Sequence, residues 1–372
     1  MGDNEIELDL YTWTDFQEIT FPPQFAADCL QVSTQTLKML EKDAGLNIAR
    51  VARGSVQIRS YTLDDLFTLA AYRRDRGHVK GFGRPITLST FVQKGGTSKT
   101  TTTCNLAILF ALRGFKTLVI DNDPQGDASS MFGYDPDLTP EELQEVGAPT
   151  DLAVNGHIGN LLQIGYQPMS LNEVVKMPFG EHGPHLIPAE SLMDDLDSFL
   201  RTANGSDFRY SLFIEQARSG LLAHCDLSDY DIIIMDNAPS NTMLTRNAIV
   251  AADFLISPVR MDKFSYRSLA RLAERLTAFA RDFQRSAEII VIPSMYVKNR
   301  PRQQRNMAKL ATLFPGKVVE TPLYQSEDYD KSLEDGVPIA LWKPGSENSL
   351  GAMRDVFKEV IARIQKKVEA RK

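Results

Sequence analysis

The fold of this chain is decided by one stretch, Phe91-Val92-Gln93-Lys94-Gly95-Gly96-Thr97-Ser98-Lys99-Thr100-Thr101-Thr102-Thr103. An apolar, β-prone run at 86–92 leads into it, and a helical pattern at 104–113 follows, closed by Gly114. A strand, a glycine turn and a helix that begins with Lys-Thr make a cradle for a polyphosphate. Backbone N–H groups of the turn and the positive end of the helix dipole face the anion. We therefore predict that Lys99 reaches the β- and γ-phosphates and that Thr100 ligates Mg²⁺.

The match to the general P-loop is incomplete. The pattern G-x-x-x-x-G-K-[ST] has glycine where this chain has Gln93 and Ser98. What remains is K-G-G-x-x-K-T, with a second lysine, Lys94, ahead of the glycines. The alternative is an ordinary basic turn, and the flanking strand and helix favour the phosphate site over it. The predicted ATP-binding residues are Lys94, Gly95, Gly96, Thr97, Ser98, Lys99, Thr100 and Thr101.

Two further apolar runs end in acidic residues. The first, 116–120, leads into Asp121-Asn122-Asp123-Pro124-Gln125, and the second, 231–235, leads into Asp236. Ligands of open α/β sheets bind outside the carboxyl ends of the strands, so these acids can face the phosphates. An apolar strand that ends in Asp is the Walker B pattern, which delivers a carboxylate to Mg²⁺. The alternative is a pair of N-capping acids in an ordinary turn.

Composition sets the limits on the class of protein. The 372 residues allow two domains, and their net charge of −7 means that any contact with nucleic acid must come from a local patch. The three cysteines are widely spaced, which indicates neither a disulfide framework nor a metal site and fits a reducing cytoplasm. No apolar run is long enough to span a bilayer. From residue 86 onward, alternating strands and amphipathic helices predict an α/β fold with a mainly parallel sheet flanked by helices.

A smaller unit precedes this domain. We expect an N-terminal arm or short helix at 1–20, a winged helix-turn-helix domain at 21–76, a Gly-rich basic linker at 77–85 and the ATPase domain at 86–372. The helix 34–44 follows Ser33, a good N-cap, and two β-prone runs meet at 53–55. In such a unit the second helix enters the major groove of DNA and the wing contacts its backbone or minor groove. The alternative is a helical dimerisation unit. The predicted DNA-binding residues are Ser33, Gln35, Lys38, Arg50, Arg53 and Arg59.

The two-lysine box, the D-x-D-P-Q segment and the Walker B strand, in this order, resemble the ParA/MinD family of deviant Walker A ATPases. The N-terminal unit resembles the MerR-like winged domain of the plasmid-type, SopA-like ParA proteins. The resemblance implies that Lys94 reaches across a dimer interface to the partner's nucleotide, and that Asp123 activates the attacking water. The catalytic residues would be Lys94, Lys99 and Asp123, and the metal site would be formed by Thr100, Asp123 and Asp236; Asp121 would support the metal or the loop.

The same resemblance implies a function. The chain would be a DNA-partition ATPase that uses ATP and Mg²⁺, forms a homodimer, hydrolyses slowly unless a centromere-binding ParB-type protein stimulates it, and represses its own operon. Operator DNA and nonspecific DNA are the expected nucleic-acid partners, with no membrane partner, in a cytoplasm where the ATP-bound form associates with the nucleoid. The alternatives are a nucleotide-responsive transcriptional repressor and a ParA-like positioning ATPase for a cargo other than DNA. The iron-protein relatives need cysteines at the dimer face, and no suitable pair exists here.

Four further segments are less clearly signalled. The basic cluster 298–305 is either a nonspecific DNA contact or a solvated loop, and the mostly acidic segment 325–331 stands where many relatives are basic. The last helix, 350–368, carries an apolar stripe that favours packing on the sheet over a membrane-surface role. Residues 134–185 read as a surface insertion with no assigned chemistry.

Overall fold

The computed structural model describes residues 13–92, 95–262 and 287–370, together with residues 270–271, 273–274, 277–278 and 281–282. The sequence from 265 to 283 predicts a long helix that carries several arginines, and this segment lies largely outside the described residues. So do Lys94 and most of the predicted N-terminal arm.

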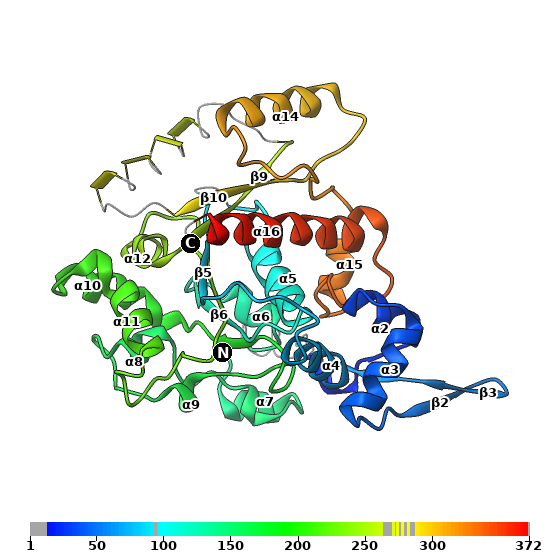
Figure 1. Cartoon of the computed structure of the whole chain (residues 1–372). Coiled ribbons are helices and arrows are strands. Elements are labelled where there is room, and N and C mark those ends of the chain that lie inside the picture. The colour runs from blue at the N-terminus through cyan, green and yellow to red at the C-terminus, as the bar shows by residue number, and fades with distance from the viewer. Residues whose placement is uncertain are drawn as a thin grey trace.

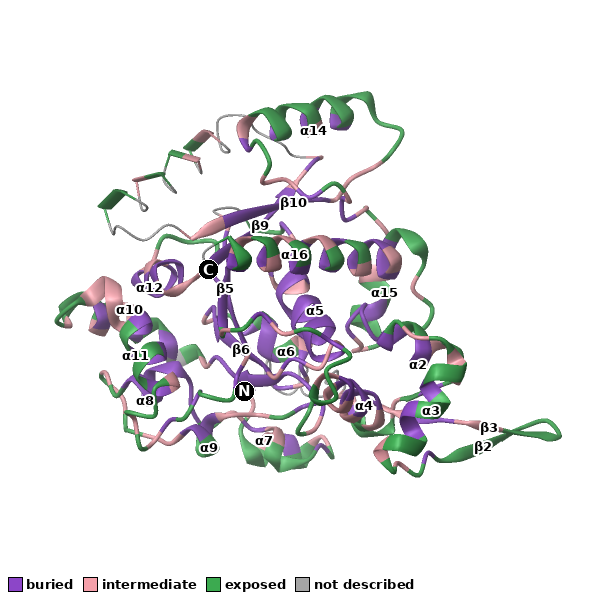
Figure 2. Cartoon of the chain, in the orientation of Figure 1, coloured by how far each residue is buried: buried purple, intermediate pink, exposed green. Residues whose placement is uncertain are grey.

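Within the described residues, six parallel strands form the central sheet, in the order β10-β9-β5-β8-β6-β7. Helices cover both faces, and the strands are almost wholly buried (Figures 1 and 2). Strands buried on both faces read as continuous apolar runs, as they do in this sequence. The predicted α/β fold with a parallel sheet is therefore confirmed. The strands are β5 (Ile86–Thr90), β6 (Thr117–Asn122), β7 (His185–Ile187), β8 (Ile232–Asn237), β9 (Phe254–Arg260) and β10 (Glu288–Ser294).

Alternate side chains of each strand face different helices. On β6, Val119 joins the core under α5 (Lys99–Ala111) and α16 (Ala352–Glu369). Leu118 and Ile120 instead join the core formed with three helices on the other face. These helices are α10 (Asp194–Thr202), α11 (Arg209–Arg218) and α12 (Met243–Ala251).

Short helices fill the segment 134–185, to which the sequence assigned no chemistry. They are α7 (Pro140–Glu145), α8 (Ile158–Leu162) and α9 (Leu171–Val174), with a 3-10 turn at Thr150–Leu152. Outside this segment, α6 (Asp127–Met131) precedes it, and 3-10 turns at Ser191–Met193 and Ser206–Phe208 follow it. The core between α8 and the sheet continues into α11. This segment therefore widens the layer of helices on the α10–α12 face.

The N-terminal unit contains the expected helix 34–44 and a hairpin formed by the two β-prone runs that meet at 53–55, together with further short elements. In chain order the unit consists of a 3-10 turn (Phe16–Glu18), β1 (Thr20–Phe21), α2 (Pro23–Leu30), α3 (Thr34–Ala44), β2 (Arg50–Arg53), β3 (Val56–Arg59), β4 (Tyr61–Thr62) and α4 (Leu63–Asp75). Ser33 caps α3, because its Oγ accepts from the N–H of Thr36 at 3.0 Å. The antiparallel hairpin β2–β3 protrudes from the molecule (Figure 1). Phe16 is buried against Phe179, with ring centroids 4.6 Å apart, so it packs within its own chain.

Helix α4 fixes the N-terminal unit to the sheet domain. Arg74 donates to Asp231 (Nη2 to Oδ1, 2.6 Å) just before β8 begins, and its guanidinium lies 4.5 Å from the ring centre of Phe115. Asp231 also accepts from the N–H of Lys116 at 2.9 Å. Residues of α4 and α5 belong to one continuous core. The unit therefore does not pack as an independent body.

The segment 77–85 is packed rather than open. Val79 and Phe82 are buried, and the ring of Phe82 stacks on that of Phe115 at 4.8 Å. The glycines and basic residues that suggested a linker surround these two apolar side chains, which anchor the segment in the core. It thus connects the two parts while adding to the packing between them.

The apolar run 318–323 predicts a further strand, and this prediction is wrong. Only single bridges form there, between Val291 and Val318 and between Tyr296 and Tyr324. The N–H groups of Glu320 and Thr321 donate instead to the carboxylate of Glu359 on α16, at 2.6 and 2.8 Å. These two donors are therefore unavailable to β10.

The C-terminal part consists of α14 (Pro301–Leu313), α15 (Asp328–Glu334), a π-helical turn (Glu347–Gly351) and α16. The apolar stripe of α16, from Met353 to Val368, is buried in the main core, which confirms the expected packing on the sheet. Among the described residues, no helix has the length and apolar character needed to cross a membrane.

We expect Gly114→Ala to loosen the docking of α4. Gly114 has a φ of +82°, and a Cβ there would lie 2.3 Å from the carbonyl oxygen of Ala70. The strain and the overlap together should lower the free energy of unfolding by about 2–4 kcal/mol in urea denaturation. The control is Gly205→Ala, where φ is +68° and nothing lies within 4 Å, with an expected loss of about 1 kcal/mol. Equal losses would contradict the docking.

Candidate nucleotide and metal site

The loop between β5 and α5 ends in a tight turn that leads directly into α5, the first helix of the sheet domain. Gly96 and Ser98 both have left-handed backbone angles, with φ of +63° and +67°. Ser98 is the N-cap of α5, and Lys99 is its first residue. The free N–H groups and the positive end of the dipole of α5 therefore lie where the sequence placed the phosphates.

Two side chains from neighbouring strands hold this turn from outside. Arg260, at the end of β9, donates from Nη1 to the carbonyl oxygen of Gly96 at 2.7 Å. Its other nitrogens pair with Asp262 at 2.9 and 2.7 Å. Ser294, at the end of β10, donates to the carbonyl oxygen of Thr97 at 3.2 Å. The motif search missed Arg260, although an Arg-x-Asp sequence at a strand's carboxyl end was a usable signal.

The metal end of the site is built around Asp236, the last acidic residue of β8. The hydroxyls of Thr100 and Thr103 donate to its two carboxylate oxygens, each at 2.6 Å. Burial raises the pKa of Asp236 to about 6, while these hydrogen bonds and the charge of Lys99 oppose the shift. Burial also lowers the pKa of Lys99, against the pull of Asp236 and Asp123.

These residues fit a bound Mg²⁺. A threonine hydroxyl beside an aspartate at a P-loop is the ligand pair that this ion takes in nucleotide sites, with phosphate oxygens and water completing its shell. The hydrogen bond between Thr100 and Asp236 brings their oxygen atoms side by side, so that both could bind the same ion. A fully buried carboxylate also favours a nearby cation.

The two acids at the end of β6 differ in their surroundings. Asp121 is fully buried and accepts from the N–H and Oγ of Ser129, at 2.8 and 2.7 Å, so it holds the loop that leads into α6. Burial raises its pKa to about 8, and the charge of Asp236 adds to the shift. Asp123 is 8% exposed and accepts from the N–H of Gln125 at 3.2 Å. Burial raises its pKa as well.

The predicted residues divide into two places. Gly95 to Thr101, Asp123 and Asp236 come together at the carboxyl edge of the sheet. The predicted DNA-binding residues lie in the N-terminal unit, which docks where β8 begins, beside Asp231. A cavity of about 430 Å³ opens beside Thr100 and Thr101, between α6 and the segment 333–338.

Residues 86–289, just over half of the chain, match the AAA domain family AAA_31. The chromosome-partitioning ATPase Soj of Treponema pallidum is 29% identical over 67% of this chain and 86% of its own length. Protein IncC of Escherichia coli is 24% identical over 69% of this chain. The match spans 63% of IncC, so this chain covers less than two thirds of that relative.

Two solved structures share the fold. The ATP complex of a Cyanothece McdA variant has a TM-score of 0.58 at 20% identity and covers 74% of this chain and 96% of that one. A structure described as "Partition Protein" has a TM-score of 0.58 at 14% identity and covers 98% of this chain and 95% of that one. At these identities the likeness shows the fold, and in the second case it extends over nearly the whole chain.

A glycine turn on a helix N-terminus, with Lys99 as the first residue of that helix and Thr100 bonded to Asp236, is the arrangement of a P-loop nucleotide site, and its residues fit ATP and Mg²⁺. The chain belongs to the ParA/MinD-type ATPases of the AAA_31 domain family.

We expect Ser98→Gly to stabilise the protein. A non-glycine residue in the left-handed region costs about 1 kcal/mol, and glycine removes that strain. The gain should be up to about 1 kcal/mol in the free energy of unfolding, while Ser98→Ala keeps the strain and gains nothing. If both variants gained equally, the serine side chain rather than the backbone angle would be the cause.

Proposed function

We propose that the chain is a plasmid-type DNA-partition ATPase that dimerises on binding ATP, binds DNA and represses its own operon. The observation that carries this proposal is the exposed helix-and-hairpin unit built onto the core of a P-loop ATPase. The names of similar proteins, such as the chromosome-partitioning ATPase Soj, support it. The protein would act in the cytoplasm and associate with the nucleoid when ATP is bound.

The N-terminal unit supplies the specific DNA contact in this proposal. Helix α2, the turn 31–33 and α3 form a helix-turn-helix, and the hairpin β2–β3 is its wing. Ser33, Gln35 and Lys38 are exposed on and beside α3. Such side chains can reach base edges and phosphates from a recognition helix.

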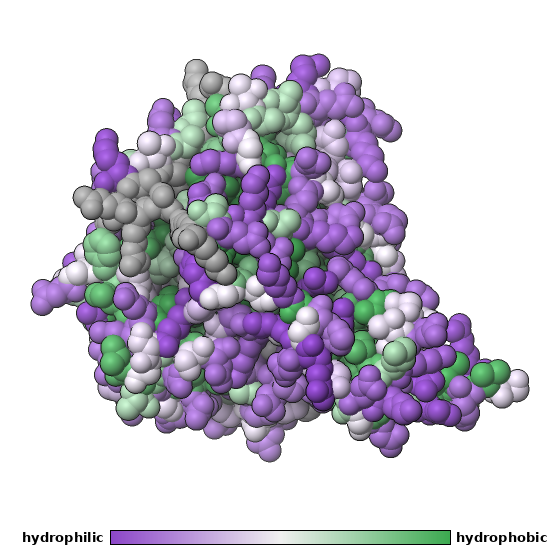
Figure 3. Space-filling view, viewed as in Figure 1, coloured by the Kyte–Doolittle hydropathy of each residue, from purple (hydrophilic) through white to green (hydrophobic). Residues whose placement is uncertain are grey.

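The wing is positively charged along an exposed hairpin. Arg50 and Arg53 are exposed, and no ion pair engages either of them within the described part of the chain. Val51 and Val56 are 48% and 60% exposed, and apolar atoms are visible near the protruding end in Figure 3. Apolar and basic side chains together at a wing tip suit insertion along a DNA groove.

Arg59 differs from the other predicted DNA contacts. Its Nε pairs with Glu41 of α3 at 2.7 Å, and Tyr61 donates to the same carboxylate. This contact ties the base of the wing to the recognition helix. Arg59 therefore sets the angle between the two elements, and its contribution to DNA binding runs through that geometry.

Helix α14 supplies the nonspecific DNA contact. Residues 298–319 contain six cations and no acidic residue, in a protein whose net charge is −7. Arg302, Arg305 and Lys309 are exposed and spaced to share one face of the helix. This basic face suits contact with DNA phosphates.

The ATPase steps follow from the site. Lys99 would hold the β- and γ-phosphates, and Asp123 would orient or deprotonate the attacking water. Lys94, outside the described residues, would reach the partner's nucleotide in the ATP-bound dimer. A centromere-binding protein of the ParB type would stimulate hydrolysis.

The exposed N-terminal unit also favours a second candidate, a transcriptional repressor that responds to nucleotide and hydrolyses little. Asp123 beside the P-loop favours turnover and keeps this candidate second. A ParA-like ATPase that positions a cargo other than DNA would share the same site, and the identity of its partner would distinguish it.

We expect Lys99→Gln to weaken ATP binding about tenfold to a hundredfold, because it removes a charge-assisted contact to phosphate. Asp123→Ala should bind ATP with near-normal affinity while turnover falls about 10²- to 10⁴-fold. Isothermal titration and phosphate release measure the two effects. Lys358→Gln, an exposed lysine on α16, is the control. Normal binding by Lys99→Gln would remove the P-loop assignment, and normal turnover by Asp123→Ala would remove the proposed role of that residue.

We expect two separable DNA contacts, measured by anisotropy with ATP across a salt series. DNA from upstream of the protein's own gene is compared with random DNA. Arg53→Ala should lose the preference for upstream DNA by about 1–3 kcal/mol. The Arg302→Ala, Arg305→Ala double variant should weaken both DNAs alike and reduce the salt slope by about 2. Unchanged binding by each variant would contradict the respective contact, and DNA binding without turnover would favour the repressor.

A further inference from the structure

A chain of buried hydrogen bonds runs behind the acidic edge of the sheet, on the face opposite α5. The hydroxyl of Tyr210 on α11 donates to Oδ1 of Asn122 at 2.7 Å, and Nδ2 of Asn122 donates to Oδ1 of Asn237 at 2.7 Å. Nδ2 of Asn237 donates to Oγ of Ser89 and to the carbonyl oxygen of Thr90, each at 2.8 Å. This hydrogen-bond chain thus joins α11, β6, β8 and the end of β5 that leads into the P-loop.

The members of this chain are out of contact with water. Tyr210 is 1% exposed, and both asparagines are fully buried. Burial raises the pKa of the Tyr210 hydroxyl far above its usual range, so it stays protonated and acts as the donor. The carbonyl oxygen of Thr90 can only accept, so the NH₂ group of Asn237 faces it and its Oδ1 faces the NH₂ group of Asn122. The Oδ1 of Asn122 is thereby turned toward α11, where the hydroxyl of Tyr210 completes the hydrogen-bond chain as its donor.

The chain lies directly against the acids. Asn122 stands between Asp121 and Asp123, and Asn237 follows Asp236. The parallel register pairs Asp121 with Asp236 and Asn122 with Asn237. Side chains alternate along a strand, so the acids face α5 and the amides face α11. Hydrogen bonds that hold the two amides in place therefore also hold the backbone at the ends of β6 and β8, which carries the acids.

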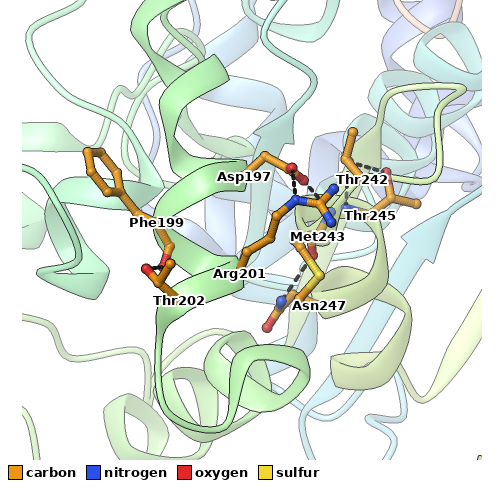
Figure 4. Close-up of polar contacts among 8 residues, drawn as sticks. All are labelled: Asp197, Phe199, Arg201, Thr202, Thr242, Met243, Thr245 and Asn247. Carbon is orange, nitrogen blue, oxygen red and sulfur yellow. Dashed lines mark hydrogen bonds and ion pairs between the residues drawn. The ribbon is translucent and has the colours of Figure 1, made fainter.

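The segment that carries Tyr210 is also fastened to the helix after β8. The N–H of Tyr210 donates to Oδ1 of Asn247 on α12 at 3.2 Å, and Nδ2 of Asn247 donates to the carbonyl oxygen of Ser206 at 2.7 Å. Helix α10 adds a second fastening. Asp197 accepts from the N–H of Met243, the first residue of α12, and pairs with Arg201 at 2.8 Å (Figure 4).

We propose that Tyr210 is a positioning residue for ATP hydrolysis, which holds the end of β6, and with it Asp123, in register with the metal-binding end of β8. The proposal rests on the proposed role of Asp123 in activating water. It gives the α10–α11 segment a function, since that segment is tied both to the end of β6 and to the start of α12. Tyr210 acts through Asn122 and touches neither nucleotide nor metal.

The test is Tyr210→Phe, which removes one hydroxyl and keeps the ring. We expect kcat to fall roughly tenfold to a hundredfold, because small displacements of a reacting group cost that much, while the Kd for ATP stays within about twofold. The matched control is Tyr230→Phe. The hydroxyl of Tyr230 is also buried and bonded at 2.7 Å, to His185, but at the opposite end of the sheet. It should lose a similar amount of stability in urea and keep its kcat.

A double-mutant cycle gives the second measurement. If Tyr210 acts only through Asn122 in the hydrogen-bond chain, the Tyr210→Phe, Asn122→Val double variant should have the same kcat as Asn122→Val alone. Additive losses, or a kcat for Tyr210→Phe equal to that of Tyr230→Phe, would overturn the proposal. Should Tyr210→Phe fail to fold, Asn122→Val alone must show the same split between kcat and Kd. Asp123→Ala distinguishes failure of the proposed function from failure of this inference. If Asp123→Ala is inactive while Tyr210→Phe hydrolyses ATP normally, only the positioning role of Tyr210 is wrong.

Discussion

The parallel register between β6 and β8 is the constraint on which the site depends. It sets Asp121 beside Asp236 and Asn122 beside Asn237 at one edge of the sheet. A slip of one residue in either strand would send an acid to the face of α11 and an amide to the face of α5. The P-loop helix can meet Asp236 through Thr100 and Thr103 only in the observed register.

Buried charge is the main electrostatic feature of this edge. Asp121 and Asp236 are fully buried, and burial raises the pKa of both. Removing carboxylates from water is costly unless hydrogen bonds and a cation compensate. Ser129 compensates Asp121, and two threonines and Lys99 compensate Asp236. A metal ion held by Thr100 and Asp236 would supply further positive charge at the point where a nucleotide would bring negative charge.

The sequence allowed the local features to be predicted and left the tertiary ones hidden. The glycine turn, the strands that end in Asp and the capped helix α3 are signalled by neighbouring residues, and all of them are present. The burial of Phe82 in a segment that resembled a linker depends on Phe115, which is distant in sequence. The missing strand at 318–323 depends on Glu359 in the same way.

Some functional candidates were invisible because their partners are far apart along the chain. Tyr210 and Asn122 are 88 residues apart, and Arg260 and Gly96 are 164 apart. One signal was available, since β6 and β8 each end in an aspartate followed directly by an asparagine, Asp121-Asn122 and Asp236-Asn237. Two amides at matching strand ends predict a cross-strand pair once the strands are known to be neighbours.

The packing of α4 against the turn before β6 has a thermodynamic consequence. Since one continuous core runs from the N-terminal unit into the sheet domain, the two parts are expected to unfold together rather than one after the other. A ligand that binds only the folded protein stabilises every residue of a cooperative unit, however far away it lies. Nucleotide bound at the P-loop would then protect the helices that support the protruding hairpin from transient unfolding. The free energy of nucleotide binding at one end of the sheet would thus stabilise the N-terminal unit, which docks at the other end.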